Sequence, residues 1–144
     1  MLLFSLEQFN YLARPLWRSA KFKRGFFKTR RFTNHELFLT IKNKVAGQKC
    51  YIFGAFAPPD ENLLNLLLLG HTLKKESARK VTALVPYLGY GRQDKNEKNK
   101  SWGLAWMGNL LAVSGIDKII TVDIHNPQSA HLLKKPIVSL KSNG

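Results

Sequence analysis

One stretch, Lys49–Val85, decides the predicted fold: KCYIFGAFAPPDENLLNLLLLGHTLKKESARKVTALV. Its first apolar run stops at a proline pair, as a strand does before residues that cannot continue its ladder. Asp60 is placed to cap a helix from about Glu61 to Glu76, whose seven leucines make it apolar nearly all round. VTALV then predicts a buried strand. Strand, helix and strand at this spacing indicate parallel strands joined by a crossover helix.

The same alternation continues on the C-terminal side. Ser101 can cap a helix from Trp102 to about Ser114, which ends at Gly115, and KIITVDIH follows as a further strand. The sequence contains no internal repeat, low-complexity segment or linker. We therefore expect one α/β domain over residues 1–144, with a mostly parallel sheet flanked by helices.

The N-terminal side gives weaker patterns. LLFSL, Leu2–Leu6, predicts a short strand, and Glu7 to about Ser19 predicts a helix that Pro15 interrupts. The segment GFFKTRRFTNHELFLTI is rich in Phe and Thr and turns at Thr33-Asn34. It predicts a pair of strands or one bent strand.

Composition limits the class of protein. The chain has 23 Lys and Arg against 9 Asp and Glu, a formal charge of +14, which favours anionic partners. Its single cysteine, Cys50, cannot form an intrachain disulfide and sits in an apolar run, where cysteine is usually a small buried hydrophobe. The start lacks the features of a signal peptide, and Leu63–Leu69 is far shorter than the ~20 residues of a membrane span. We expect a soluble, cytoplasmic protein without a membrane anchor.

Three polar segments follow predicted strands, at the sheet edge where α/β proteins bind ligands: PPDE after Phe56, PYLGYGRQD after Val85 and DIHNPQ after Val122. In the last of these, Asp123 and His125 are two residues apart, so both could point to one side of a strand. A carboxylate and an imidazole suit Mg²⁺ or Mn²⁺ beside a phosphate. The alternative is a pair that only hydrogen-bonds to the next loop.

The PYLGYGRQD segment has the residue types of a ligand loop. Gly89 and Gly91 permit close approach of the backbone, and Arg92 and Gln93 supply a forked cation and an amide that could hold phosphate or an adenine edge. The segment matches neither GxGxxG nor GxxxxGK[ST]. A solvated connection therefore stays open as the alternative.

A basic segment, residues 14–31, is a third candidate binding site, after Asp123 with His125 and the PYLGYGRQD segment. It carries eight cations and no acid, with four aromatic residues among them. The residues are Arg14, Arg18, Lys21, Lys23, Arg24, Lys28, Arg30 and Arg31, with Trp17, Phe22, Phe26 and Phe27. Cations interleaved with aromatic rings can track a phosphate backbone and stack bases, which allows an RNA-binding module. The alternative is a strand pair with its rings inward and its cations in water.

Taken together, FTNHEL, PYLGYGRQD and TVDIH followed by Gln128 resemble, in order and spacing, the N-terminal domain of ribose-phosphate pyrophosphokinases. The likeness covers nearly the whole chain, and PYxGYxRQD carries most of its specificity. It implies a fold of phosphoribosyltransferase type. It also implies transfer of the β,γ-pyrophosphoryl group of Mg-ATP to ribose 5-phosphate, which gives phosphoribosyl pyrophosphate and AMP, with ATP near a subunit interface.

The resemblance assigns roles to several residues. Arg92 and Gln93 would hold ATP, and Glu97 would lie near the adenine. His125 would ligate the Mg²⁺, with Asp123 beside it. A metal and a fixed guanidinium suit this chemistry because they offset charge on the transferred phosphoryl group.

The hairpin sequence departs from the family pattern. Phe32, Asn34 and Glu36 occupy the family's F-x-D-G-E segment, which meets the nucleotide of a neighbouring subunit. Here Asn34 and His35 replace Asp-Gly, so a carboxylate and a turn glycine are lost. The loop KNEKNKSWG after RQD is also shorter than in the family.

The sequence contains no D-D-x-x-D-T-G-T loop, which in the family binds ribose 5-phosphate, and no mobile catalytic loop. Both would lie in a C-terminal half, so we expect ribose 5-phosphate to bind only when that half is supplied. Three hypotheses remain: a ribose-phosphate pyrophosphokinase that is incomplete as this chain, a non-catalytic nucleotide-binding or regulatory subunit, and a basic RNA-binding module. The first two predict a homo-oligomer or assembly with a full-length homologue.

Overall fold

The structure is a computed structural model and describes residues 1–143. The strands are β1 (Leu2–Ser5), β2 (Lys23–Arg24), β3 (Phe27–Arg31), β4 (Leu37–Ile41), β5 (Lys49–Phe53), β6 (Lys80–Val85), β7 (Lys118–Val122) and β8 (Ile137–Leu140). The α-helices are α1 (Asn10–Arg18), α2 (Glu61–Lys75) and α3 (Gly103–Val113). The 3₁₀ helices are η1 (Glu7–Phe9) and η2 (Pro127–Leu133).

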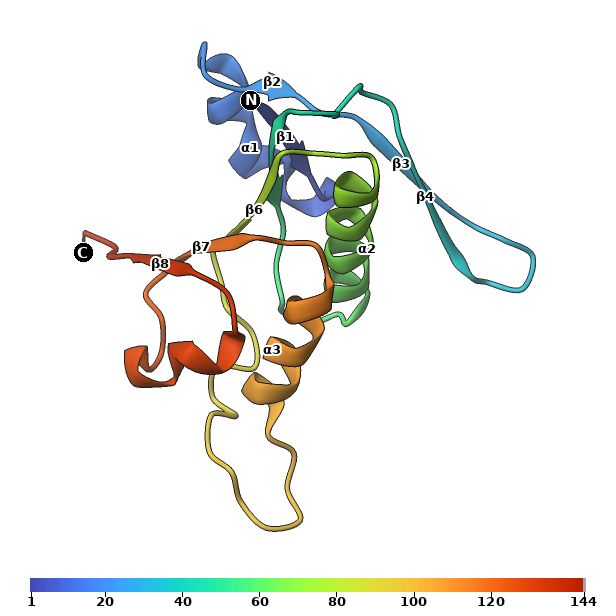
Figure 1. Ribbon diagram of the computed structural model, residues 1–144. Helices are drawn as coiled ribbons and strands as arrows, with labels where there is room; N and C mark the ends of the chain where they lie inside the picture. The colour runs from blue at the N-terminus through green and yellow to red at the C-terminus, as the bar shows by residue number, and fades with distance from the viewer. Residues whose placement is uncertain (144) are drawn as a thin grey trace.

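Six strands form one fully parallel sheet in the order β2-β1-β5-β6-β7-β8 (Figure 1). This confirms the predicted α/β class with a mostly parallel sheet. From β5 to β7 the chain advances in one direction across the sheet, whereas it steps the other way from β1 to β2. Because such crossovers are right-handed, α2 and α3 cover one face and α1 covers the other.

The hydrophobic core lies between the central strands and the helices α2 and α3. Alternate residues of these strands, such as Ile52, Ala83 and Ile119, are fully buried there, together with Leu66 and Leu111 from the two helices. This alternation follows from the period of two along a strand, which sends every second side chain to the same face. The core therefore holds the carboxyl ends of β5, β6 and β7 in fixed positions.

The opposite face of the sheet is only partly covered. On β7 and β8 it presents Val122, Val138 and Leu140, which are 36%, 38% and 51% exposed. Val122 and Leu140 are register partners, so these side chains form a continuous apolar surface. Parallel sheets are normally buried on both faces.

The predicted strand pair forms as an antiparallel hairpin of β3 and β4, with its turn at Thr33 and Asn34. Buried Leu39 anchors the hairpin, and α2 lies between the sheet and β4. The Arg31 guanidinium also pairs with the Glu61 carboxylate at the start of α2. Beyond this contact the tip projects away from the sheet (Figure 1).

Several predicted details were wrong. The last strand ends at Val122 and does not run through His125, because Asp123 takes a left-handed φ of 45°. Asp60 occupies the N-cap position of α2 but makes no side-chain cap, since its carboxylate accepts a hydrogen bond from the Tyr90 hydroxyl at 3.1 Å. Likewise, α3 begins at Gly103 without a side-chain cap. Strands β2 and β8 and helix η2 had not been predicted.

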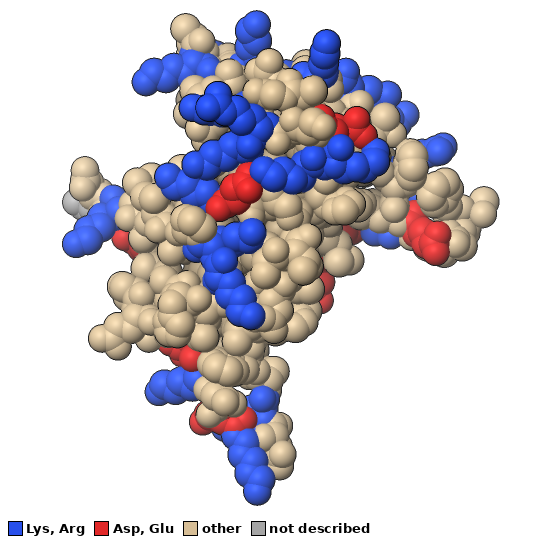
Figure 2. All heavy atoms as spheres, viewed as in Figure 1, with Lys and Arg blue, Asp and Glu red and all other residues tan. Residues whose placement is uncertain are grey.

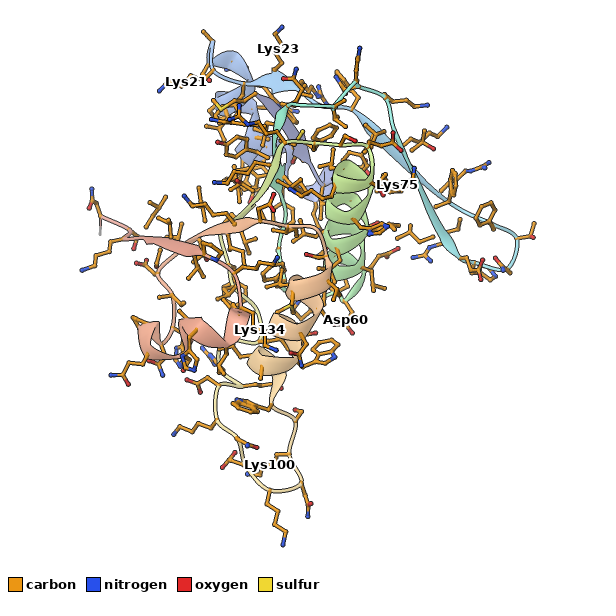
Figure 3. All side chains as sticks on the ribbon, in the orientation of Figure 1. Lys21, Lys23, Asp60, Lys75, Lys100 and Lys134 are labelled. Atoms are coloured by element: carbon orange, nitrogen blue, oxygen red, sulfur yellow. The ribbon has the colours of Figure 1, made fainter. Side chains whose placement is uncertain are left out.

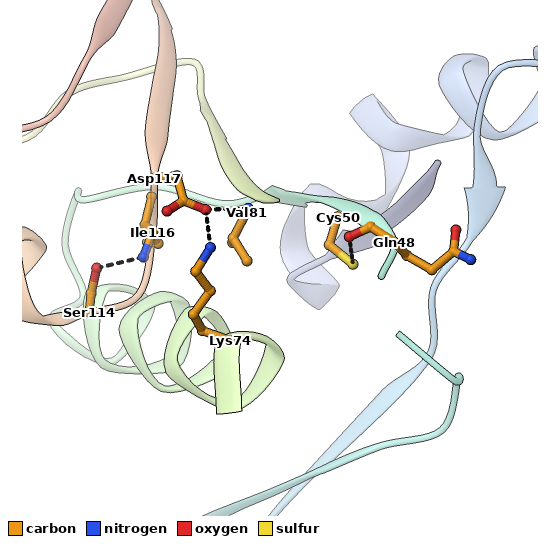
Figure 4. A network of polar contacts seen from close by, with 7 residues as sticks. All are labelled: Gln48, Cys50, Lys74, Val81, Ser114, Ile116 and Asp117. Carbon is orange, nitrogen blue, oxygen red and sulfur yellow. Dashed lines mark hydrogen bonds and ion pairs between the residues drawn. The ribbon is translucent and has the colours of Figure 1, made fainter. Parts of the chain in front are cut away.

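A partly buried ionic contact joins three elements beside the core (Figure 4). Asp117, just before β7, accepts hydrogen bonds from Lys74 Nζ at 2.5 Å and from the backbone N of Val81 at 2.8 Å. Burial raises the pKa of Asp117, but these two hydrogen bonds and the Lys74 charge outweigh it and lower the pKa overall. The carboxylate thus ties the end of α2 to the beginnings of β6 and β7.

Cys50 is fully buried, as predicted, and burial raises the pKa of its thiol to about 11. Of the helices in residues 1–143, none has the length and apolar character needed to cross a membrane.

Candidate functional site

The loop that joins β6 to α3 begins by passing close to the loop after β5. A Cβ on Gly89 would lie 2.7 Å from the carbonyl carbon of Phe56, so the glycine permits contact with protein backbone there. In this loop it is Tyr90, not a glycine, whose backbone is left-handed, with a φ of 63°. The Tyr90 ring packs edge-on against Trp106 at 5.6 Å, and burial together with the hydrogen bond to Asp60 raises the pKa of its hydroxyl. The loop is therefore anchored to both α2 and α3.

Gln93 lies over the start of α3. Its backbone carbonyl accepts a hydrogen bond from the N–H of Leu104 at 3.0 Å, and its side-chain Oε1 accepts one from Ser101 Oγ at 2.9 Å. A Cβ on Gly103 would lie 2.8 Å from Gln93 Cδ, so only glycine leaves room for this side chain. With Oε1 engaged, the Nε2 amide of Gln93 is the group oriented to donate to a ligand.

Asp94 joins this loop to the loop that follows β7. Its Oδ2 accepts hydrogen bonds from Asn126 Nδ2 and Ser129 Oγ, both at 2.9 Å. Those two hydrogen bonds lower the pKa of Asp94. Sequence reasoning had named neither Asp94 nor its partners as site residues, although Asp94 is the last letter of RQD and Asn126 directly follows His125.

These contacts create a cleft of about 580 Å³ at the carboxyl ends of β6 and β7. It is lined by Arg92, Gln93, Asp94, Lys95, Glu97, Lys100, Ser101 and His125. Four residues singled out from the sequence, Arg92, Gln93, Glu97 and His125, therefore lie on one cleft. Lys100 and Glu97 pair at 3.5 Å on the loop, and Figure 3 shows Lys100 near its tip.

Asp123 is not among the residues that line this cleft. Its carboxylate accepts hydrogen bonds from the backbone N of Ser142 at 3.2 Å and from the Ser142 hydroxyl, and these lower its pKa. Residues 1–143 contain no group of three or more His, Cys, Asp and Glu side chains that could hold a metal. Mg²⁺ usually keeps several waters and binds through one or two carboxylates plus substrate phosphates. Of the two predicted metal ligands, the cleft contains the His125 imidazole and not the Asp123 carboxylate.

The other predicted nucleotide contacts lie at the tip of the β3–β4 hairpin. Phe32, Asn34 and Glu36 are all exposed, and Asn34 Oδ1 accepts a hydrogen bond from the N–H of Glu36 at 3.2 Å. His35 takes a left-handed φ of 69°, and its carbonyl accepts a hydrogen bond from Arg31 at 2.7 Å. The tip and the β6–α3 loop extend from different ends of the molecule (Figure 1). One chain therefore does not bring these residues to the cleft.

The eight cations of the basic segment are all exposed. Two guanidiniums lie against aromatic rings. Arg24 is 4.4 Å from the Trp17 ring and 4.9 Å from the Phe26 ring, and Arg30 is 5.4 Å from Phe32 and 4.9 Å from Phe38. Phe27 packs inward beside Phe4, whereas Phe26 is 50% exposed. Lys and Arg atoms cover much of this end of the molecule (Figure 2). RNA binding by this surface stays a prediction.

Comparison with known proteins identifies the family. The model of the N-terminal domain of ribose phosphate pyrophosphokinase matches residues 1–115. The chain belongs to the ribose-phosphate pyrophosphokinase family. A ribose-phosphate pyrophosphokinase from Cereibacter sphaeroides is 32% identical over 117 residues, which cover 80% of this chain and 35% of that protein. The ribose-phosphate pyrophosphokinase 1 of Streptococcus mutans is 29% identical over 147 residues, which cover 95% of this chain and 46% of that protein.

The fold agrees with the family assignment. The crystal structure of phosphoribosylpyrophosphate synthetase from Mycobacterium smegmatis matches with a TM-score of 0.87 and 25% identity over 97% of this chain and 48% of that chain. The chain thus spans about a third to a half of these ribose-phosphate pyrophosphokinases. The resemblance predicted from the motifs is confirmed at the level of family and fold.

Proposed function

We propose that residues 1–144 form one domain that supplies the ATP-binding part of a ribose-phosphate pyrophosphokinase. The complete enzyme would transfer the β,γ-pyrophosphoryl group of Mg-ATP to the anomeric hydroxyl of ribose 5-phosphate, in the cytoplasm, for nucleotide biosynthesis. The observation that carries the proposal is the cleft shared by Arg92, Gln93, Glu97 and His125. It lies where parallel sheets of this kind bind ligands.

Each group has a distinct task in this proposal. The Arg92 guanidinium offers two parallel N–H donors to phosphate oxygens. The Gln93 amide donates to the nucleotide, and Glu97 lies beside the adenine. His125 would hold the Mg²⁺ that enters with ATP, whereas Asp123, whose carboxylate accepts hydrogen bonds from Ser142, would reach the metal only if those bonds break. Bound Mg²⁺ neutralises charge on the phosphates during transfer.

The site would be completed by a second polypeptide chain. Phe32 at the hairpin tip presents an exposed ring, which is suited to stack on an adenine base. Asn34 and Glu36 flank it with an amide and a carboxylate. Because this tip is remote from the cleft of its own chain, we propose that it contacts the nucleotide of a neighbouring subunit in a homo-oligomer.

Binding and catalysis can be tested separately. Isothermal titration of Mg-ATP should show saturable binding, and Arg92→Ala should weaken it at least tenfold, because a charged hydrogen bond contributes about 1.5–3 kcal/mol. Lys98→Ala, at an exposed position of the same loop that does not line the cleft, is the matched control and should bind Mg-ATP about as the unaltered chain does. Equal binding by the Arg92 variant would remove the basis of the proposal.

For catalysis, the part of the Mycobacterium smegmatis synthetase that this chain does not match would be co-expressed as a separate polypeptide. With Mg-ATP and ribose 5-phosphate, the pair should form AMP above the level of either polypeptide alone. ATP binding without AMP formation would favour the second hypothesis. In that case the chain acts as a non-catalytic subunit that associates with a synthetase.

The open face of the sheet favours this second hypothesis as well. Val122, Val138 and Leu140 form an apolar surface of a kind that parallel sheets rarely leave uncovered. Association through this face should be lost in a Val138→Asp, Leu140→Asp variant. Co-purification of a tagged chain with the full-length synthetase measures it, and a chain that stays monomeric in the presence of the synthetase would count against assembly.

A further inference from the structure

A second cleft lies at the carboxyl end of β1, on a different part of the sheet from Arg92. Between β1 and β5 the direction of the chain across the sheet reverses, since β1 leads to β2 on one side and β5 leads to β6 on the other. In open α/β sheets, ligands bind in the crevice outside the strand ends at such a reversal. The two segments that diverge there meet directly, because Gln8 Nε2 in η1 donates to Asn62 Oδ1 in α2.

The cleft has a volume of about 610 Å³ and a mixed lining of carboxamides, cations and aromatic rings. The side chains that carry this chemistry are Glu7, Gln8, Asn62, Asn65, Arg24, Lys28, Trp17 and Phe26. Glu7 is the one acid against two cations, so the lining is net positive. A site of this composition favours an anionic ligand that also carries several hydroxyl groups.

Two amides of α2 behave differently in this lining. Asn62 is 8% exposed and is held by Gln8 and by the carbonyl of Ala57, which accepts from Asn62 Nδ2 at 3.3 Å. In contrast, Oδ1 of Asn65 is buried without a hydrogen-bond partner among residues 1–143. Such an orphaned acceptor destabilises the folded chain. A ligand hydroxyl that reaches Asn65 after a side-chain rotation would remove this penalty.

Arg24 is held in place at the rim of the cleft. Its guanidinium lies 4.4 Å from the Trp17 ring and 4.9 Å from the Phe26 ring, and Trp17 is itself fixed by a hydrogen bond from Nε1 to the carbonyl of Leu3 at 2.9 Å. Stacking between two rings orients the planar group and leaves its N–H edge free for an anion. Lys28 on β3 adds a second positive charge.

We propose that this cleft binds a small sugar phosphate, with the phosphate on Arg24 and Lys28 and the sugar hydroxyls on the amides of Gln8 and Asn65. The shared chemistry is a phosphate monoester of ribose, which ribose 5-phosphate and AMP both contain. This would be a second site, separate from the ribose 5-phosphate site that the family resemblance places in a C-terminal half. This inference is independent of ATP binding at Arg92. Failure of one leaves the other intact.

Trp17 provides the measurement, since it lines the cleft whereas Trp102 and Trp106 lie beside the β6–α3 loop. In a Trp102→Phe, Trp106→Phe background, ribose 5-phosphate and AMP would be titrated while the fluorescence of Trp17 is followed. We expect a saturable change in Trp17 fluorescence with at least one of these two ligands. The one that binds more tightly is the better candidate for the natural ligand. Inorganic phosphate should bind at least tenfold more weakly, because it lacks the hydroxyl contacts.

Two variants and one control test whether the ligand binds in this cleft. Arg24→Ala should weaken binding at least tenfold, and Lys23→Ala, the neighbouring exposed cation outside the lining, should leave it unchanged. Asn65→Leu should abolish the hydroxyl contact while the unfolding midpoint stays equal or rises, because an orphaned polar group is replaced by an apolar one of similar shape.

Three results would overturn the proposal. They are the absence of any fluorescence change with millimolar ligand, equal affinity for inorganic phosphate, and unaltered binding by both Arg24→Ala and Asn65→Leu.

Discussion

Replacing Gly108 by alanine tests how closely η2 is joined to α3. A Cβ at this position would overlap the carbonyl oxygen of Leu132 and lie 2.8 Å from its carbonyl carbon and 3.1 Å from Cα of Leu133. These are backbone atoms, so rotation of a side chain cannot relieve the overlap. The 3₁₀ helix as a whole must move away from α3.

The expected change in the free energy of unfolding follows from two opposing effects. Alanine stabilises a helix interior by about 1 kcal/mol relative to glycine, whereas overpacking a well-packed contact costs about 1–3 kcal/mol and occasionally more. Because the overlap is with backbone atoms, we take the upper end of the overpacking cost and expect a net loss of about 2 kcal/mol in the free energy of unfolding. For a chain of this size that corresponds to about 6 °C in the unfolding midpoint.

The displacement should also affect the cleft. Ser129 in η2 and Asn126 just before it donate to Asp94, so movement of η2 pulls on the loop that carries Arg92. Urea unfolding measures the stability, and calorimetry with Mg-ATP measures the cleft. Val113→Ala, at a position in α3 that is 78% exposed, serves as the control. It should change neither the free energy of unfolding nor the affinity for Mg-ATP by much. A Gly108→Ala protein as stable as the unaltered chain would refute the packing argument.

Three further predictions follow from other contacts. Gly103→Ala should weaken Mg-ATP binding about 2- to 10-fold without loss of stability, because the new Cβ displaces Gln93 while alanine suits the helix; calorimetry and thermal unfolding check this. Asp117→Asn should lower the free energy of unfolding at pH 7 by about 1 kcal/mol in urea titrations, a value reduced for partial exposure of the pair with Lys74. Because the folded-state pKa of Asp117 is lowered from 3.8, that difference should be full above pH 5 and disappear as the pH falls through the folded-state pKa; a difference that stays constant at every acid pH at which the protein remains folded would contradict it. The Cys50 thiol should resist iodoacetamide in the folded protein at pH 8, since it is fully buried with a pKa of about 11, and mass spectrometry should detect alkylation only after unfolding.

The central part of the fold was predictable because its signals are local. Between Lys49 and Val85, apolar runs of strand length, a leucine-rich helix and a proline pair follow one another, and each limits the conformation of its own residues. Strand β2 has no such signal. It consists of Lys23 and Arg24, which are paired to Leu2 and Leu3 only because the crossover brings them there.

Capping and strand-end geometry failed where a distant partner intervened. Asp60 has the residue type and position of an N-cap. Its carboxylate instead accepts a hydrogen bond from the hydroxyl of Tyr90, thirty positions away. The pairing of Asp123 with His125 assumed that β7 continues past Val122. A left-handed turn and the contacts of Asp123 with Ser142 end that alternation. These competitors are set by tertiary structure, which spacing alone does not reveal.

The sequence predicted several of the residues that line the candidate site, but it did not predict the hydrogen bonds that hold the loops of the site together. Arg92, Gln93 and His125 could be grouped because strand ends of a parallel sheet share one edge. The hydrogen bonds of Asp94 that hold the two loops together depend on the position of η2, an element without a clear sequence pattern. The β1 cleft was not foreseen at all, since its lining comes from six elements, β1, η1, α1, β2, β3 and α2.

The two halves of the predicted nucleotide site also bear on assembly. Leu39 and the Arg31–Glu61 ion pair hold the base of the hairpin to α2, whereas the cleft is held by the far ends of β6 and β7. To bring Phe32 into its own cleft, the hairpin would have to leave α2 and expose Leu39 to water. Two chains can meet without that loss. We therefore expect ATP affinity to rise with protein concentration as subunits associate, and a Phe32→Ala variant to lose this dependence while it keeps the weaker binding of the single chain.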